Sequence, residues 1–229
     1  MYQRLPKNYI PTHYELYMHI KQKYDSFEAS VSITFQKNQD SDEVKLNVYD
    51  NICITSIKQN DIPLEHTIEN DLLTITKSPT QDFSSYPIQI NYLVHPLLTS
   101  HNGFYSECNC YFTKFEPNYA PSLLPCFDDP SIRSSFTVKL CIPTNLTGIT
   151  NMPIETIQKG EEETTLTFQV SPPMCTYLLC ICVGQFDYIE SQTKSGLPVK
   201  MYSEKGRSQF LQKHLEAAIS SVEWMENET

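Results

Sequence analysis

YELYMHI, residues 14–20, indicates the fold, because its apolar side chains Tyr14, Leu16, Met18 and Ile20 alternate with more polar ones. Successive side chains of an extended strand point to opposite faces, so a period of two places these four on one face. An amphipathic helix would repeat its apolar positions every three or four residues instead. The stretch therefore predicts a β-strand with one buried face.

The same alternation recurs along most of the chain, and turn-forming segments separate the runs. Segments such as KNQDSDE at 37–43 and QKGEEET at 158–164 carry the polar residues and glycine that turns favour. The further alternating runs lie at 29–35, 44–48, 88–94, 136–142 and 166–170. Strands at this spacing predict an all-β fold, an antiparallel β-sandwich or saddle-like domain, which we place at residues 1–202.

Two later segments depart from the alternation. YLLCICVGQF at 177–186 is continuous rather than alternating, which predicts a strand covered on both faces. From about residue 205 the apolar residues follow helical spacing, which predicts one C-terminal helix with Ser208 as its N-cap. The predicted stripe consists of Leu211, Leu215, Ala218, Ile219, Val222 and Met225. Because no later segment covers this stripe, we expect a protein or domain partner to pack on it.

Composition and charge limit the classes of function. Lys and Arg total 17 against 27 Asp and Glu, a net charge of -10, which disfavours nucleic acid and anionic membranes as partners. The apolar runs are too short for a membrane segment, and the N-terminal residues lack the apolar core of a secretory signal. We therefore expect no membrane segment, no nucleic-acid partner and a cytoplasmic location.

The eight cysteines and six histidines form no recognisable metal or disulfide framework. An even number of cysteines would allow four disulfides in an exported protein, but reduced thiols suit a chain long enough to build its own core. The Cys-x-Cys at 108–110 has no second ligand pair at zinc spacing, and no His-Glu-x-x-His occurs. We expect no catalytic residue, no metal ligand and no cofactor in this chain.

FTKFEPNYAPSLLPCFDDP, residues 112–130, is the unusual stretch, with four prolines around a single glutamate. Pro117 restricts the backbone of Glu116, so this carboxylate is held on a stiffened segment and is able to bind a cation. The alternative is that Glu116 faces solvent or pairs with Lys114. Asp128 and Asp129 before Pro130 are typical of a turn in which aspartates accept bonds from backbone N–H groups.

The ordered motifs resemble the N-terminal β domain of the aminopeptidase N-like zinc metallopeptidases, the family that includes puromycin-sensitive aminopeptidase. TKFEPNYAPSLLPCFDDPSIRSSF at 113–136 is similar to the family segment that contains Phe-Glu-Pro and Pro-Cys-Phe-Asp-Glu-Pro. The likeness extends to GFY at 103–105, NMP at 151–153, PMCTYLLCICVGQF at 173–186 and GLPVKMYSEKG at 196–206. These matches run nearly from end to end.

The resemblance implies that Glu116 binds the free α-amino group of a peptide substrate. Lys114 stands where relatives carry the Gln that lines the pocket for the first side chain, so Lys114 is implied as a second substrate-binding residue. A lysine there neutralises Glu116, repels the incoming ammonium group of the substrate, or favours an acidic first residue. Pro121 replaces the usual Arg, and Asp129 replaces the usual Glu.

The family's zinc ligands and its Gly-x-Met-Glu-Asn loop belong to a catalytic domain with no counterpart in these residues. WMEN at 224–227 imitates that loop without its glycine and lies inside the predicted helix. We therefore expect residues 203–229 to be a linker and the first helix of a missing catalytic domain. Zinc is expected in the full-length family member, and this chain alone is expected to be inactive.

Two interpretations of the function follow. In the first, the chain is the non-catalytic N-terminal domain of a zinc aminopeptidase and meets the peptide N-terminus together with a catalytic domain. In the second, it is a free-standing, inactive binding or scaffold module derived from such an enzyme. The coding sequence after Thr229 distinguishes them, because a His-Glu-x-x-His there indicates a fragment and a stop codon indicates a module.

Overall fold

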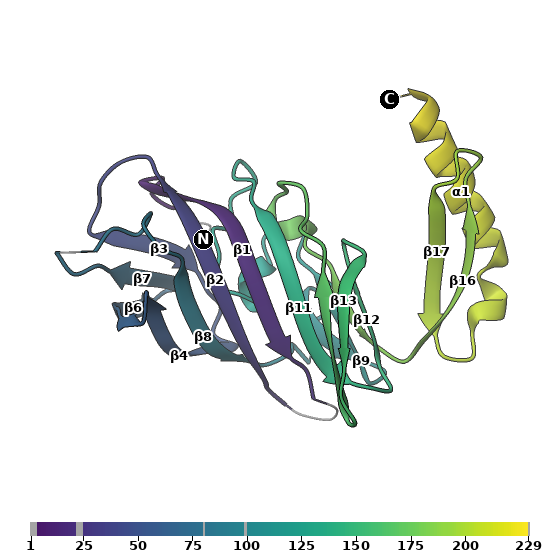
Figure 1. Ribbon diagram of the computed structural model, residues 1–229, viewed down its shortest axis with the longest axis horizontal. Helices are drawn as coiled ribbons and strands as arrows, with labels where there is room; N and C mark the ends of the chain where they lie inside the picture. The colour runs from purple at the N-terminus through teal and green to yellow at the C-terminus, as the bar shows by residue number, and fades with distance from the viewer. Residues whose placement is uncertain (1–3, 22–24, 80, 99, 229) are drawn as a thin grey trace. The chain divides into compact units, whose positions relative to one another are not determined.

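The computed structural model describes residues 4–21, 25–79, 81–98 and 100–228 and consists mainly of strands (Figure 1). The elements in chain order are β1 (Tyr9–His19), β2 (Phe27–Lys37), β3 (Glu43–Asn47), β4 (Ile52–Gln59), β5 (Ile62–Pro63), β6 (Glu65–Glu69), β7 (Leu72–Thr76), β8 (Ile88–Val94), β9 (Gly103–Glu107), β10 (Cys110–Lys114), η1 (Ala120–Ser122), β11 (Ser135–Pro143), β12 (Thr147–Thr150), β13 (Ile154–Lys159), β14 (Glu163–Phe168), η2 (Thr176–Leu178), β15 (Ile181–Gly184), β16 (Phe186–Gln192), β17 (Pro198–Glu204), η3 (Ser208–Phe210) and α1 (Gln212–Glu228). The predicted all-β class with a C-terminal helix is confirmed.

The largest sheet has eight strands in the order β13-β14-β11-β1-β2-β8-β4-β5. β1 pairs with β2 in the antiparallel sense, which places Leu16 opposite Val31. On its other side β1 pairs with β11 in the parallel sense, which places Leu16 opposite Val138. The other strand pairs described in this sheet are antiparallel. The first strand of the chain therefore lies inside the sheet, and Figure 1 shows β1 and β11 side by side.

The apolar face of β1 forms part of the core, as the alternation predicts. Tyr14, Leu16 and Met18 are 0% exposed, whereas Glu15 on the opposite face is exposed. Tyr14 stacks on Phe136 with ring centroids 5.0 Å apart, and its hydroxyl accepts a 3.0 Å hydrogen bond from the Phe127 backbone N–H. Complete burial of a large apolar side chain stabilises the fold by about 1.5–3 kcal/mol. The core thus connects β1 and β11 to the proline-rich stretch.

Two smaller sheets belong to the same compact unit. Strands β3, β7 and β6 form one in the order β3-β7-β6, and the other has the order β12-β15-β10-β9. In the second sheet β10 pairs with β9 on one side, with Lys114 opposite Gly103, and with β15 on the other, with Phe112 opposite Cys182. The start of the 112–130 stretch is therefore an inner strand with hydrogen-bonded neighbours on both sides.

The prediction of one strand at 177–186 is wrong in its extent and in its burial. Residues 176–178 form the 3₁₀ helix η2, closed by a 3.1 Å bond from Leu179 N–H to Thr176 C=O, and β15 begins only at Ile181. Ile181 and Val183 are 0% exposed, but Cys182 is half-buried. A continuous apolar run has no alternation between apolar and polar residues. The sequence therefore could not show that only one face of this strand is covered.

Residues Asn145–Thr147 and the described residues from Gly184 onward group by their contacts into a second compact unit. Within it β16 and β17 form an antiparallel hairpin that contacts α1, and Leu215 is 3% exposed. The hairpin thus covers part of the predicted stripe, while Trp224 and Met225 remain 63% and 50% exposed. That 203–229 begin a catalytic domain stays a prediction.

The predicted N-cap of the helix is wrong. Ser208 is the first residue of the short 3₁₀ helix η3, and α1 starts at Gln212. The Leu211 N–H donates to Ser208 C=O at 3.0 Å, which closes a tighter turn before the α-helix begins. In the described part of the chain, no helix has the length and apolar character needed to cross a membrane.

Candidate functional site

The stretch after β10 is a loop packed like a core. Phe115 is 1% exposed, and every residue of 120–129 is buried. Pro121 occupies the first turn of η1, where its missing N–H costs no helical bond, and its C=O accepts a 3.0 Å bond from the Tyr49 N–H. The backbone of this loop is therefore held in place, and so is the starting point of any side chain that projects from it.

Hydrogen bonds fix the backbone on both sides of η1. The Tyr119 N–H donates to Phe115 C=O at 2.7 Å, which closes the turn that contains Glu116. The Ser122 hydroxyl donates to Tyr119 C=O at 2.7 Å and accepts from the Phe104 N–H at 2.9 Å. The Asn51 side-chain amide donates to Ser122 C=O at 2.8 Å. The loop is thus tied to itself, to β9 and to the residue before β4.

Gly103 allows β9 to lie against η1. Its φ is +84°, and a Cβ added there would lie 2.5 Å from the Ser122 Oγ and 2.9 Å from the Leu97 Cδ1. Both the backbone conformation and the close approach favour glycine at this position. The Gly-Phe-Tyr motif therefore helps to hold the loop through Ser122.

Glu116 is the exposed residue at the start of this braced loop. It lies between buried Phe115 and Pro117, and the Glu116–Pro117 peptide bond is cis. Across residues 4–21, 25–79, 81–98 and 100–228, its carboxylate makes no hydrogen bond or ion pair. An ionised carboxylate can only accept hydrogen bonds, so Glu116 is able to accept them from water or from a ligand.

Lys114, the second predicted site residue, is exposed at the last position of β10. Among the described residues it forms no ion pair with Glu116, so the predicted alternative of a Lys114–Glu116 pair is not formed. The two residues lie close in sequence at the same end of β10. Their roles toward a substrate stay predictions.

The turn predicted at Asp128 and Asp129 is confirmed for Asp129. Its Oδ1 accepts bonds from the Ser131 N–H at 2.8 Å and the Ser131 hydroxyl at 2.7 Å. Burial acts to raise the pKa of Asp129, but these bonds and nearby Lys7 lower it overall. Asp128 differs, because it is 5% exposed and accepts a 2.6 Å bond from the Thr176 hydroxyl. Both aspartates act in the packing of this loop.

All eight cysteines are free in the structure, and their redox state in the cell stays a prediction. Cys180 and Cys182 bring their sulfur atoms to 4.0 Å on the exposed side of β15. Asn151 of the Asn-Met-Pro motif accepts a 2.8 Å bond from the Cys180 N–H and donates a 2.8 Å bond to Leu178 C=O. This motif therefore fixes the segment between η2 and β15.

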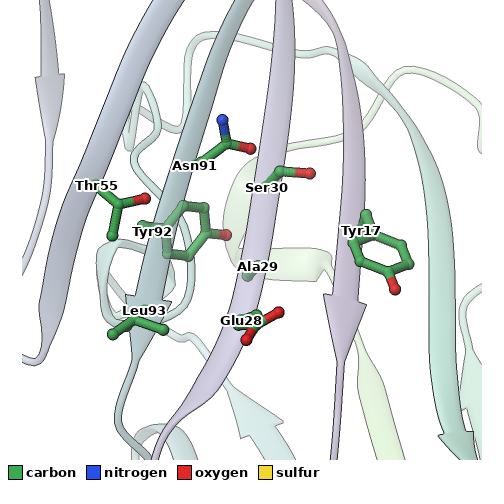
Figure 2. A pocket seen from close by; sticks show the side chains of 8 residues that line it. All are labelled: Tyr17, Glu28, Ala29, Ser30, Thr55, Asn91, Tyr92 and Leu93. Atoms are coloured by element: carbon green, nitrogen blue, oxygen red, sulfur yellow. The ribbon is translucent and has the colours of Figure 1, made fainter.

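A hollow of about 450 Å³ lies on the face of the eight-stranded sheet opposite the core (Figure 2). Its lining comes from β1, β2, β4 and β8 and consists of Tyr17, Glu28, Ala29, Ser30, Thr55, Asn91, Tyr92 and Leu93. Neither Glu116 nor Lys114 is part of it. The lining holds no nucleophile paired with a base, so we assign it no catalytic role.

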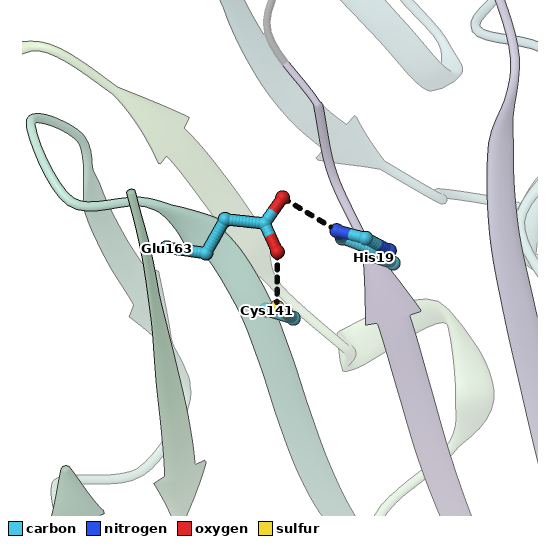
Figure 3. A group of neighbouring side chains, drawn as sticks. All are labelled: His19, Cys141 and Glu163. Carbon is cyan, nitrogen blue, oxygen red and sulfur yellow. Dashed lines mark hydrogen bonds and ion pairs between the residues drawn. The ribbon is translucent and has the colours of Figure 1, made fainter. Parts of the chain in front are cut away.

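Three metal-ligand side chains meet next to this face, and the search by sequence spacing missed them. His19, Cys141 and Glu163 lie on β1, β11 and β14, and their donor atoms are all within 4.8 Å of one another (Figure 3). The His19 Nε2 is 2.7 Å from Glu163 Oε1, and the Cys141 thiol donates to Glu163 Oε2 at 3.5 Å. The residues are far apart in sequence, so only the strand order brings them together.

Comparison with known proteins identifies the family. Residues 10–178 match the Peptidase M1 N-terminal domain family. The chain is 27% identical to puromycin-sensitive aminopeptidase of Caenorhabditis elegans over 97% of its own length and 25% of that protein. It is 26% identical to endoplasmic reticulum aminopeptidase 1 of Homo sapiens over 98% of its own length and 26% of that protein. It therefore spans about a quarter of these relatives.

The fold agrees with this match. An M1 zinc metallopeptidase from Deinococcus radiodurans superposes with a TM-score of 0.76 at 18% identity, over 89% of this chain and 49% of that one. A mutant of that metallopeptidase bound to a Tyr-Ser-Ala substrate superposes with a TM-score of 0.73, at 18% identity over 87% of this chain and 48% of that one. The family match covers most of the chain, and the chain belongs to the Peptidase M1 N-terminal domain family.

Proposed function

We propose that the chain is the substrate-anchoring domain of a zinc aminopeptidase, in which Glu116 binds the free α-amino group of the peptide. One observation carries the proposal: Glu116 is an exposed carboxylate at the start of a loop whose residues 120–129 are all buried. The sequence likeness to aminopeptidases supplies the substrate class. Binding the amino terminus in this way selects for free N-termini and positions the first peptide bond.

The physical basis is a charge-assisted hydrogen bond. An ammonium group donates three hydrogen bonds, and an ionised carboxylate accepts them with about twice the strength of a neutral acceptor. Such a bond contributes most to affinity when the residues that form it lose little conformational freedom on binding. The Tyr119-to-Phe115 bond and the burial of Phe115 hold the Glu116 backbone in place before any substrate arrives.

The residues of this chain do not fit the zinc site of the family. The sequence contains no His-Glu-x-x-His, and in the described residues the group of three possible ligands lies on sheet strands rather than on a helix. We therefore derive no hydrolytic step from this chain, and peptide cleavage requires a catalytic domain. The inactive-module interpretation differs only in whether such a domain accompanies the chain.

A chimera tests the role of Glu116. Residues 1–229 replace the matching N-terminal quarter of the C. elegans relative, and hydrolysis of aminoacyl arylamides is measured with and without Glu116→Gln. Loss of the ammonium bond should lower kcat/KM by about 10–100-fold. Glu107→Gln is the matched control, because Glu107 is an exposed glutamate on neighbouring β9. Equal activities of the two variants would contradict the proposal.

Lys114 is tested in the same chimera. We propose that its ammonium group borders the pocket for the first side chain, so substrates with an acidic first residue gain a favourable charge pair. Lys114→Gln should remove a preference for acidic over neutral first residues and leave the turnover of neutral substrates unchanged. A chimera without any acidic preference would contradict this part of the proposal and leave the role of Glu116 intact.

A reducing compartment such as the cytoplasm is the proposed location. All eight cysteines are free, including buried Cys110 and Cys126, and such a set of thiols persists where the cell keeps cysteines reduced. The close approach of the Cys180 and Cys182 sulfur atoms adds to this argument, because adjacent thiols are readily oxidised elsewhere.

A further inference from the structure

We propose that His19, Cys141 and Glu163 form a zinc-binding site on the face of the eight-stranded sheet opposite the core. The site is separate from the anchoring role of Glu116, and it departs from the expectation that the chain holds no metal ligand. The strand order produces it: β14, β11 and β1 are consecutive neighbours in the sheet. His19 lies opposite Cys141, and Pro143 lies opposite Glu163 in the next pair.

The donor atoms already approach the spacing that zinc requires. With bonds of about 2.0–2.3 Å, neighbouring ligand atoms of a tetrahedral zinc are about 3.4–3.6 Å apart. The Cys141 Sγ is 3.5 Å from Glu163 Oε2, and the donor atoms of all three residues lie within 4.8 Å of one another. The His19–Glu163 contact of 2.7 Å must lengthen slightly to admit the ion.

The chemistry of the three donors also suits zinc. Imidazole nitrogen, thiolate sulfur and carboxylate oxygen are its usual protein ligands, and three of them leave the fourth position for water. The side chains of His19 and Glu163 are 18% and 40% exposed, so the site is partly desolvated yet open to solvent. Cys141 is 8% exposed and lies at the bottom of the cluster.

Acidic and basic residues both surround the cluster. Glu28 on β2 lies opposite His19 on β1 in the strand register. It lines the hollow of Figure 2 together with Tyr17. Glu28 and Glu163 bring negative charge to this region, whereas Lys21 acts on Glu163 and the Lys139 Nζ lies 6.0 Å from the centroid of the Tyr17 ring. The carboxylate of Glu163 is therefore the negative charge that would face a bound ion directly.

Metal binding here must release a proton. Zinc binds cysteine as the thiolate, so the Cys141 thiol gives up its proton when the ion binds. A zinc ion deprotonates a coordinating thiol, so we expect zinc affinity to rise with pH.

The test measures zinc and cobalt binding to the metal-free chain of 229 residues at neutral pH. We expect one zinc per chain by calorimetry with release of a proton, and a sulfur-to-metal charge-transfer band when Co²⁺ is added. Cys141→Ser should remove the band. His19→Ala and Glu163→Gln should each weaken zinc binding by more than about tenfold, because even indirect partners of a metal contribute that much.

Matched variants separate this cluster from other ligands. His13→Ala removes a histidine on the same strand that bonds to Ser135, and Cys53→Ser removes an exposed thiol. Both should leave binding unchanged, as should replacement of Cys180 and Cys182 by serine. Absence of stoichiometric zinc in the wild-type chain would overturn the proposal. So would binding that survives Cys141→Ser and disappears without Cys180 and Cys182. Circular dichroism shows whether each variant is folded.

The outcome is independent of the proposed substrate anchor. Zinc binding by this cluster would persist in Glu116→Gln, and loss of the cluster would not alter the selection of free N-termini. Zinc at this position links three strands of the sheet, so an additional readout is a higher unfolding temperature with zinc for the wild-type chain and none for Cys141→Ser.

Discussion

Asp128 shows how its surroundings change a single carboxyl group. Burial raises its pKa from 3.8 to about 6, although the hydrogen bond from Thr176 acts in the opposite direction. Between pH 3.8 and about 6 the folded protein therefore holds a proton that the unfolded chain has lost. In that window stability falls as the pH rises, and ionisation costs about 3 kcal/mol once the pH exceeds 6.

Asp128→Asn should remove this pH dependence, because the amide keeps the shape and accepts the Thr176 bond without a charge. We expect the variant to match the wild type near pH 4 and to become more stable by up to about 3 kcal/mol above pH 6. Urea unfolding at a series of pH values measures the difference. Asp129→Asn is the control, since the lowered pKa of Asp129 predicts the opposite slope. A stability difference between Asp128→Asn and the wild type that does not change with pH would contradict the raised pKa of Asp128.

Strand β1 derives its stability from one face. Leu16 is 0% exposed and contacts the core, whereas Glu15 beside it is exposed. Leu16→Ala should lower the free energy of unfolding by about 2–5 kcal/mol, through lost burial and the cavity that remains. Glu15→Ala should change it by less than about 0.5 kcal/mol. Denaturant midpoints of the two variants provide the comparison, and similar shifts would show that β1 does not pack as described.

The alternating pattern predicts where the strands lie in the sequence, but it does not predict which strands pair with each other. It identified β1, β2, β8 and β11, because the side chains of one strand carry the signal by themselves. The parallel pairing of β1 with β11 was not predictable, since register depends on residues far apart in the chain. At Ser208 a 3₁₀ turn precedes the helix, and helix propensity does not distinguish the two over so few residues.

At the scale of the whole molecule, the two candidate sites differ in how they could be found. Glu116 belongs to one short motif, so the sequence alone indicated it. His19, Cys141 and Glu163 become neighbours only when three strands of the sheet assemble, so no spacing rule could detect them. The burial of the loop at 120–129, which follows Glu116, could also be expected from the sequence, because this loop consists largely of prolines and apolar residues.

The thiol content of the folded chain is a property of the whole molecule. All eight cysteines are free, so the protein should react with eight equivalents of a thiol reagent under denaturing conditions. Its unfolding temperature should be the same with and without reductant, because disulfides contribute nothing to the fold. Fewer than eight thiols in protein isolated with rapid alkylation would contradict both the free cysteines and the proposed reducing compartment.

The parallel partner of β1 has a consequence for the order of synthesis. β1 is made first and can form its hairpin-like pairing with β2 early, but its other edge waits for β11, which follows most of the sheet in the chain. Until then that edge exposes unpaired backbone groups, the kind of surface that recruits other strands. The nascent protein therefore depends on the late arrival of residues 135–143, and a ribosome stalled before them would leave an aggregation-prone intermediate.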